Sequence, residues 1–368
     1  MTRTLRQIVR SSVFILLSLG MGYAAPLELR RGVNLEGWLE LVPFRPITAE
    51  QTAQLETIKK SGFDFVRLMV NPAFVIEARP GAPEPQASLE RVLKATQKQN
   101  LKVVVSFYDL SNAKAQVLKG GTARDTYLVL VEKFARLLEQ YSSSVVFEPI
   151  DQPVDPENWN CAPSSFDWNK VQGQFMAAAR RGAPRLTLMA TGLCYSEGDA
   201  LTQIRPLEDK NVLYSFQYLE PLIFTQQGNP GNLEWNVLKG IPYPANAAQL
   251  KTSSPGLLAK ISDPKLRQKV KAALEGYAGS GFAEADVRMA LGRVSGWARQ
   301  NNVSVLLKSF TVHSSAPRKD RLRWFRDVRL NAERQKLAWS VWTWQSPFGY
   351  GILEGGKLSA EVKAALGL

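Results

Sequence analysis

The run FDFVRLMV at residues 63–70 is apolar at most positions and does not alternate between apolar and polar residues. Such runs are typical of parallel strands that are buried on both faces. Seven similar runs alternate with helical stretches, and we expect strands at 31–35, 102–108, 145–150, 185–191, 212–218, 304–311 and 336–343. Eight strands, each followed by a helix or a helix-like connection, predict an α/β fold of the (β/α)8 TIM barrel type. An open, doubly wound sheet is the alternative architecture.

The segments between the expected strands carry helix signals. Leu89, Val92, Leu93 and Thr96 follow the i, i+3, i+4, i+7 spacing of an amphipathic helix. Thr48, followed three residues later by Gln51, indicates a capping box at a helix start. Residues 219–285 are too long for a plain loop, so we expect a long insertion after the sixth strand that could wall a cleft.

The N-terminus has the pattern of an export signal. Arg3, Arg6 and Arg10 precede an apolar stretch at 13–21, and Gly22-Tyr23-Ala24 offers small residues for cleavage. We therefore expect a signal peptide at 1–24, a single domain at 25–368, and a periplasmic or secreted protein. The alternative is an uncleaved membrane anchor, although the apolar stretch is shorter than the ~20 residues that span a bilayer. No later stretch reads as a transmembrane helix.

The composition restricts the possible chemistry. The 368 residues include 46 Lys and Arg, 33 Asp and Glu, two Cys and a single histidine, His313. One histidine excludes a His-rich metal site, and two cysteines exclude a four-cysteine metal centre. We expect no metal and no cofactor, which leaves carboxylates as the catalytic groups. The formal charge is +13, and removal of the three signal-peptide arginines leaves +10, which favours anionic partners.

The two cysteines have two interpretations. In an exported protein a cysteine pair can stay oxidised, and Cys161 and Cys194 fall in the loops after the fourth and fifth expected strands. Neighbouring loops of a barrel could bring them together, so we expect a disulfide. Two independent free thiols are the alternative.

Functional residues of a (β/α)8 barrel lie at the C-terminal ends of its strands. These ends are rich in amides, aromatic rings and some acids, which suit a sugar-binding cleft. The candidate binding residues are Asn34, Trp38, Arg67, Tyr108, Gln217, Tyr218, Trp342 and Trp344. For Trp38, Trp159, Trp235 and Trp342, a place in the hydrophobic core is an equal alternative.

Five segments resemble glycoside hydrolase family 5, the cellulase-like retaining β-glycanases. They are RGVNLEGWLELVPF at 31–44, GFDFVRLMVNP at 62–72, VVFEPIDQP at 145–153, YSFQYLEPLIFTQQG at 214–228 and WSVWTWQSPFGYG at 339–351. They occur in the family's order over nearly the whole mature chain. The resemblance implies a (β/α)8 barrel that acts on or binds a β-glucan-type polysaccharide.

The same resemblance implies a loss of the catalytic pair. The family's acid/base glutamate follows an asparagine, and the matching residues here are Asp151 and Gln152. The family's nucleophile, a glutamate, corresponds to Ser309, whereas Arg67 and Trp342 match the family pattern. The family's histidines fall on or near Tyr108 and on Gln217. Retaining hydrolysis needs two carboxyl groups ~5–5.5 Å apart, so we expect an impaired enzyme, a pseudoenzyme that binds polysaccharide.

Two other functions remain open. An active glycosyl hydrolase could use relocated carboxylates among Glu36, Asp109, Asp151 and Glu220. The protein could also be an interaction subunit of exopolysaccharide assembly or export, with the basic helix expected at Arg318–Arg334 as the contact to an anionic polymer or surface. The alternative for this helix is an ordinary solvated face. It shows no aromatic interleaving of the kind that a nucleic-acid groove uses, and we expect no nucleic-acid partner.

Overall fold

The computed structural model describes residues 25–41, 43–76, 84–109, 113–232 and 234–368. Within these residues eight parallel strands close into a barrel in chain order, and β1 pairs with β8. The strands are β1 (Arg31–Leu39), β2 (Phe65–Val70), β3 (Lys102–Phe107), β4 (Val145–Glu148), β5 (Thr187–Thr191), β6 (Val212–Tyr218), β7 (Val305–Phe310) and β8 (Ala338–Val341). The predicted (β/α)8 barrel is confirmed. The proposed signal peptide, 1–24, lies outside the described residues.

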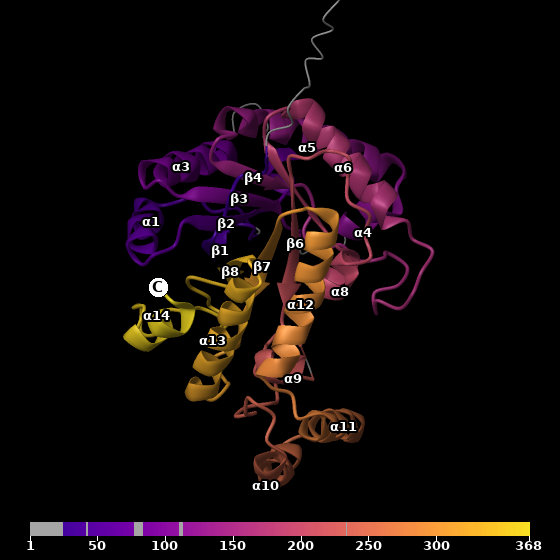
Figure 1. Cartoon of the computed structure of the whole chain (residues 1–368), viewed down its shortest axis with the longest axis vertical. Coiled ribbons are helices and arrows are strands. Elements are labelled where there is room, and N and C mark those ends of the chain that lie inside the picture. The colour runs from indigo at the N-terminus through magenta and orange to yellow at the C-terminus, as the bar shows by residue number, and fades with distance from the viewer. Residues whose placement is uncertain (1–24, 42, 77–83, 110–112, 233) are drawn as a thin grey trace, which may run out of the picture.

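Helices surround the barrel, as Figure 1 shows. They are α1 (Ala49–Lys60), α2 (Ala73–Ile76), α3 (Glu84–Lys98), α4 (Ala113–Lys119), α5 (Gly121–Leu138), the 3-10 helix η1 (Glu139–Tyr141), α6 (Trp168–Gly182), α7 (Leu193–Ser196), α8 (Gly198–Leu201), α9 (Leu222–Thr225), α10 (Ala247–Leu258), α11 (Pro264–Ser280), α12 (Glu284–Asn301), α13 (Arg318–Arg334) and α14 (Ala360–Leu366). The capping box that the sequence predicts opens α1: the Thr48 hydroxyl accepts from the Gln51 N–H, and the Gln51 side chain accepts from the Thr48 N–H.

The first strand is longer than its sequence pattern indicates. β1 continues past Leu35, where we expected it to end, and pairs again at Leu39 with Val70 of β2. A register shift separates these two stretches, and Gly37 within it has φ of 81°. This irregularity explains why the sequence predicts that the strand ends at Leu35. A bulge interrupts the apolar pattern by which a strand is recognised.

The barrel interior is built in two layers. A lower apolar layer consists of Leu29, Phe65, Val104, Val146, Met189, Leu213 and Leu306. Side chains two positions apart on a strand point to the same face. On each strand that contributes to the apolar layer, the residue two positions later is polar. With their neighbours on β1 and β8, these buried residues form the polar layer: Asn34, Arg67, Ser106, Glu148, Thr191, Ser215, Lys308 and Ser340. The barrel is therefore apolar below and polar toward the C-terminal ends of its strands.

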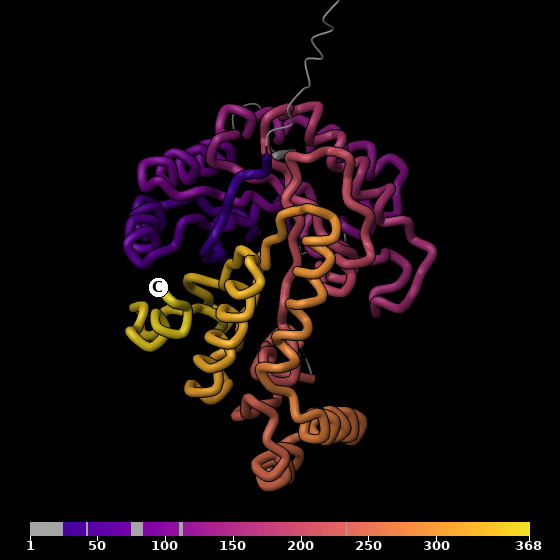
Figure 2. Tube along the Cα trace, in the orientation of Figure 1, coloured from indigo at the N-terminus to yellow at the C-terminus, as the bar shows by residue number. Residues whose placement is uncertain are grey.

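The expected insertion after β6 consists of α9 and a helical hairpin formed by α10 and α11. Figures 1 and 2 show this hairpin projecting away from the barrel, beyond the end of β6. Its base is closed where the Ala245 N–H donates to the Phe282 carbonyl over 2.8 Å. Within the described part of the chain, no helix is both long and apolar enough to cross a membrane.

Candidate functional site

A cluster of four buried charges occupies the polar layer. Arg67 on β2 donates through Nη2 to Glu148 Oε2 at 3.0 Å and to Asp151 Oδ2 at 2.6 Å. Lys308 on β7 contacts the other oxygen of each of these carboxylates through Nζ. All four side chains are at most 1% exposed. We call Arg67, Glu148, Asp151 and Lys308 the charge cluster, and its two positive and two negative charges balance.

The two carboxylates of the charge cluster lie close together. Since one nitrogen atom is 3.0 Å from Glu148 and 2.6 Å from Asp151, the two oxygens are no more than 5.6 Å apart. Burial by itself would raise the pKa of Asp151, but Arg67 and Lys308 outweigh burial and hold that pKa well below its usual range. Both acids are buried and paired with cations, unlike the free pair of carboxyl groups that retaining hydrolysis needs.

Neutral side chains complete the hydrogen bonding of the charge cluster. Asn34 on β1 accepts from Arg67 Nη1 and donates to Ser340 on β8. Ser106 accepts from Arg67 Nε and donates to Glu148, and Ser215 also donates to Glu148. Buried charges are costly unless they are paired and hydrogen-bonded. The polar layer meets both conditions. Asn34 and Arg67, both predicted to bind substrate, are buried in it and hydrogen-bond to other residues of the layer.

A pocket of about 400 Å³ opens at the ends of β5 and β6. Gln152 and Gln217, both predicted site residues, lie at its wall, and the Gln152 amide donates to the Gln217 side-chain oxygen over 2.9 Å. Tyr195 and Trp235 supply aromatic walls. We call this cavity the amide pocket. Its mixture of amides and rings suits the hydroxyl groups and apolar faces of a sugar.

Three carboxylates also line the amide pocket: Glu197, Asp199 and Glu220. Desolvation raises the pKa of Glu197, and the negative charges of Glu220 and Asp199 raise it further. The pKa of Glu220 is raised by desolvation as well. Tyr218, another predicted site residue, lines the pocket with a buried hydroxyl that has no partner among the described residues. The pocket thus brings together Gln152, Gln217, Tyr218 and Glu220.

A second cavity, of about 750 Å³, lies between β1, α1 and the loops after β7 and β8. Glu36 lines it, with one buried oxygen that has no partner within the described chain, and burial raises the pKa of Glu36 to about 7. Arg321 and Trp38 are also in its wall. We call this cavity the Glu36 pocket. Glu36 thus lines a different cavity from Glu197, Asp199 and Glu220.

The other predicted residues are distributed between core and rim. Trp38 and Trp344 are buried in the hydrophobic core, and Trp342 is half-buried after β8. Tyr108 and Asp109 are half-buried after β3, and burial raises the pKa of Tyr108. Ser309 is buried on β7, in register with Gln217 of β6. Of the other tryptophans considered for the cleft, Trp235 is half-buried and Trp159 is exposed.

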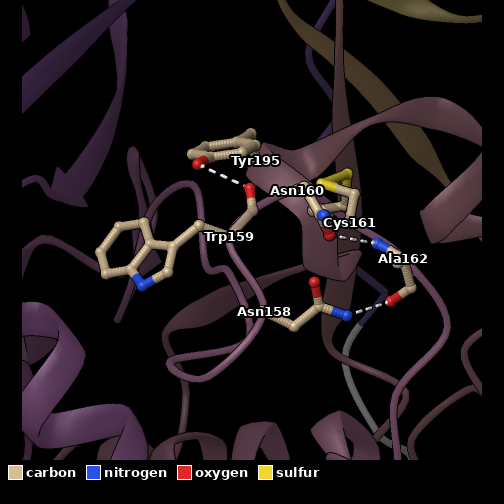
Figure 3. The surroundings of a disulfide bond; sticks show 7 residues. Asn158, Trp159, Asn160, Cys161, Ala162 and Tyr195 are labelled. Carbon is tan, nitrogen blue, oxygen red and sulfur yellow. Dashed lines mark hydrogen bonds between the residues drawn. A yellow bond between two sulfur atoms is a disulfide. The ribbon is translucent and has the colours of Figure 1, made fainter.

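The expected disulfide is present between Cys161 and Cys194, with 5.3 Å between the Cα atoms. It joins the loop after β4 to the short helix α7 after β5. Figure 3 shows the bond beside the Tyr195 ring, with the Tyr195 hydroxyl donating to the Trp159 carbonyl over 3.1 Å. The prediction that these two loops are neighbours is therefore confirmed.

The basic helix has the predicted bounds, Arg318–Arg334, and is α13. Much of its charge is paired: Arg318 contacts Glu354 and Glu361, and Arg329 contacts Glu333. Arg334 lies 3.9 Å from Glu284. Arg321 is buried and donates to the backbone carbonyls of the loops after β7 and β8. These contacts leave a less positive face than the sequence alone indicates.

Sequence reasoning missed two features of the site. The sequence did not predict that Lys308 and Glu148 are partners. A signal was present, because each residue lies two positions after an apolar residue of the lower layer on its own strand. Glu197 was not predicted at all. It follows a turn in which Cys194, Tyr195 and Ser196 have positive φ values, and the sequence shows no pattern for such a turn.

Residues 31–347 match the model of the cellulase family, glycosyl hydrolase family 5. Endoglucanase C of Acetivibrio thermocellus is 24% identical over 216 residues, and Cellodextrinase A of Ruminococcus flavefaciens is 22% identical over 212 residues. In both cases the match covers 54% of this chain and 60% of the relative. The chain thus spans less than two thirds of the length of these relatives.

Two solved structures illustrate how widely this fold is shared. The cellulose synthase subunit Z, CcsZ, from Clostridioides difficile has a TM-score of 0.69 at 20% identity, with 92% of this chain and 99% of that chain covered. Thermotoga maritima Cel5A, solved in complex with cellobiose, has a TM-score of 0.68 at 17% identity, with 92% and 97% covered. At these identities the likeness shows a shared fold.

Proposed function

The chain belongs to glycosyl hydrolase family 5, the cellulase family, and from this premise we propose that it binds a β-glucan-type polysaccharide without hydrolysing it efficiently. The observation that carries the proposal is the charge cluster. At the floor of the barrel's C-terminal face, the closely spaced carboxylates of Glu148 and Asp151 are buried and paired with Arg67 and Lys308. A carboxylate held in this way is available neither for attack nor for proton transfer.

The positions where the family carries its catalytic glutamates support the same conclusion. By the resemblance of their motifs, these positions hold Gln152 and Ser309. Gln152 is hydrogen-bonded to Gln217, and an amide has no proton with a pKa useful for general acid catalysis. A serine hydroxyl without a neighbouring base does not replace a carboxylate nucleophile. The amide pocket keeps hydrogen-bonding groups for a sugar, while an amide and a hydroxyl stand at the two positions where the family has its catalytic glutamates.

The proposal includes export to the periplasm or the cell exterior. The basic and apolar pattern of residues 1–24 supports a signal peptide. The Cys161–Cys194 disulfide supports an oxidising compartment, where such bonds persist.

Two parallel assays test the proposal. Reducing-sugar release is measured on a panel of β-glucans and β-mannans, and binding to the same polymers is measured by affinity electrophoresis and calorimetry. We expect binding to at least one β-glucan and no turnover above a heat-denatured control. Robust turnover that Asp151→Asn or Glu220→Gln abolishes would overturn the proposal, and so would the absence of binding to every polymer.

A second candidate function is hydrolysis by relocated carboxylates. It is favoured by the grouping of Glu197 and Glu220 in the amide pocket, where each has a raised pKa. A raised pKa is what a general acid requires near neutral pH. This candidate predicts turnover that is lost in both Glu197→Gln and Glu220→Gln but kept in Glu275→Gln, a change on the remote helix α11.

A third candidate is a non-catalytic subunit of exopolysaccharide assembly or export. It is favoured by the fold likeness to a protein described as a cellulose synthase subunit. The contact surface would be α13, several of whose arginines are already paired within the chain. A pull-down that is weakened both by salt and by Arg323→Glu would support this candidate, and no captured partner at low salt would count against it.

A further inference from the structure

We propose that the disulfide-linked loops after β4 and β5 hold Trp159 as a stacking platform for a neutral β-linked glucan chain that extends out of the amide pocket. The inference rests on the proposed function and adds to it a binding residue and a substrate class. The expected ligand is an extended, uncharged chain rather than a single sugar or an acidic polymer.

Trp159 is held in place by its backbone. Its carbonyl accepts the 3.1 Å hydrogen bond from the Tyr195 hydroxyl, and Cys161, two residues later, is linked to Cys194. The Tyr195 N–H donates to the Pro153 carbonyl over 2.9 Å, at the start of the same loop. The two loops are thus joined by the disulfide and by two hydrogen bonds that Tyr195 donates. A side chain on this support loses less freedom on binding than one on an unbraced loop.

The indole of Trp159 has no evident role in the hydrophobic core. The residue is 49% exposed, whereas Trp168 of the same loop region is 4% exposed at the start of α6. Figure 3 shows the indole extending away from the disulfide and from the neighbouring backbone. A ligand that covers this exposed ring removes apolar surface from water, which favours binding. The flat face of a sugar ring is a partner of suitable shape and polarity.

Tyr195 connects the backbone of Trp159 to the amide pocket. Its side chain contacts the Trp159 backbone, and the same residue lines the pocket together with Gln152 and Gln217. One sugar residue in the pocket and a neighbouring residue on Trp159 would therefore belong to one chain that passes Tyr195. A disaccharide would occupy the pocket and gain little from the platform, while a longer chain would use both.

The charges of the pocket select the class of sugar. Among the described residues that line it, the acids Glu197, Asp199 and Glu220 outnumber one cation, Arg293. That cation is already bound to Asp199, with nitrogen–oxygen distances of 2.9 and 3.1 Å. The remaining negative charge repels uronic acids and other anionic sugars. A neutral glucan carries no such cost, which is why the proposal specifies an uncharged chain.

The experiment compares the affinities of cellohexaose and cellobiose by calorimetry on the full chain. Trp159→Ala is expected to weaken cellohexaose binding about 3- to 10-fold, the range for one aromatic stacking contact, and to leave cellobiose unchanged. Trp159→Phe should retain most of the affinity. Val129→Ala is the matched control, because it removes a side chain of 54% exposure on α5, away from the pocket, and it should have no effect.

A second arm tests the disulfide. The double variant Cys161→Ser, Cys194→Ser should lose the same preference for the longer chain, with circular dichroism confirming that the barrel is folded. If this variant does not fold, the Trp159 series alone decides. Unchanged cellohexaose affinity in Trp159→Ala overturns the inference and leaves the proposed function standing, as does tight binding of polygalacturonate by the wild-type protein. Failure of the wild-type protein to bind any β-glucan overturns both.

Discussion

Lys308 lies near the end of β7, and its ammonium group contacts Glu148, Asp151 and the Ser196 hydroxyl. With Arg67, it balances two carboxylates that would otherwise repel each other at close range. Lys308 thus makes Glu148 and Asp151 part of a buried ion-pair network. The effect of a single substitution at this position can therefore be predicted from the contacts that it removes.

We predict that Lys308→Met destabilises the protein by about 3–5 kcal/mol, the range for removing one partner of a buried ion pair. Within the described chain, Arg67 would then be the cation whose side chain contacts both carboxylates. Urea unfolding followed by tryptophan fluorescence measures the change. Lys319→Met, on the exposed surface of α13, is the control and should change stability by less than about 0.5 kcal/mol. A loss below about 1 kcal/mol at Lys308 would contradict this account of the charge cluster.

Glu36 leads to a prediction about pH. Burial raises its pKa from the usual 4.5 to about 7, so the native state retains a proton that the unfolded state releases. The stability due to this group is complete below about pH 4.5 and is lost as pH rises through 7. Glu36→Gln should therefore match the wild type at pH 4.5 and be more stable at pH 8.5, by about 1 kcal/mol once its partial exposure is allowed for.

Urea unfolding at the two pH values measures this difference. Glu50→Gln, which alters an exposed carboxylate at the start of α1, is the control and should give the same small change at both pH values. Equal stability of Glu36→Gln and the wild type at pH 8.5 would contradict the raised pKa.

At the scale of elements, α13 is attached to the top of the barrel through Arg321. Its guanidinium donates to the Val312 carbonyl over 3.0 Å and to the Gly351 carbonyl over 2.6 Å, and it lies 5.1 Å from the Phe325 ring centroid. Val312 follows β7, and Gly351 lies in the loop after β8. One side chain therefore fixes a helix and two loops that form part of the Glu36 pocket.

We predict that Arg321→Ala lowers the free energy of unfolding by about 2–4 kcal/mol, because it leaves the buried Val312 carbonyl and the half-buried Gly351 carbonyl without this donor. Arg323→Ala, two residues later and exposed, should have an effect below about 0.5 kcal/mol. Chemical denaturation of both variants provides the comparison. Equal effects of the two changes would show that Arg321 does not connect these elements.

The sequence predicts elements better than it predicts their contacts. The limits of α13 and the start of α1 follow from local signals, a run of charge and the Thr48–Gln51 capping box. The end of β1 was missed because a bulge hides it. Lys308 and Asp151 are 157 positions apart, and their contact depends on the closed barrel. No local sequence pattern indicates a contact between residues so far apart in the chain. The pairing within the charge cluster could therefore be recognised only in the folded structure.

The whole molecule consists of a barrel and the projecting hairpin α10–α11. The two ends of the hairpin meet at the Ala245–Phe282 hydrogen bond. Leu250, Val270 and Leu274 are buried in it, and Tyr277 donates to the Pro242 carbonyl. The barrel strands are contributed by other parts of the chain, so the hairpin is an appended unit.

Replacing residues 247–280 by a short Gly-Ser linker should therefore leave a folded barrel. We expect retained cooperative thermal unfolding with a midpoint within about 5 °C of the wild type, and unchanged cellobiose binding, because the residues that line the amide pocket lie outside the deleted segment. Tyr277→Phe in the full-length chain is the control for loss of the Pro242 contact alone. Loss of cooperative unfolding in the linker variant would show that the hairpin is part of the barrel's core.

The charge cluster also affects the response of the protein to heat. Hydration of charged groups becomes less favourable as temperature rises, so the desolvation penalty of a buried ion network falls on warming. Arg67, Glu148, Asp151 and Lys308 are then less costly to bury, while their mutual attraction remains. The charge cluster thus stabilises the barrel by an amount whose relative contribution grows as the protein approaches its melting temperature.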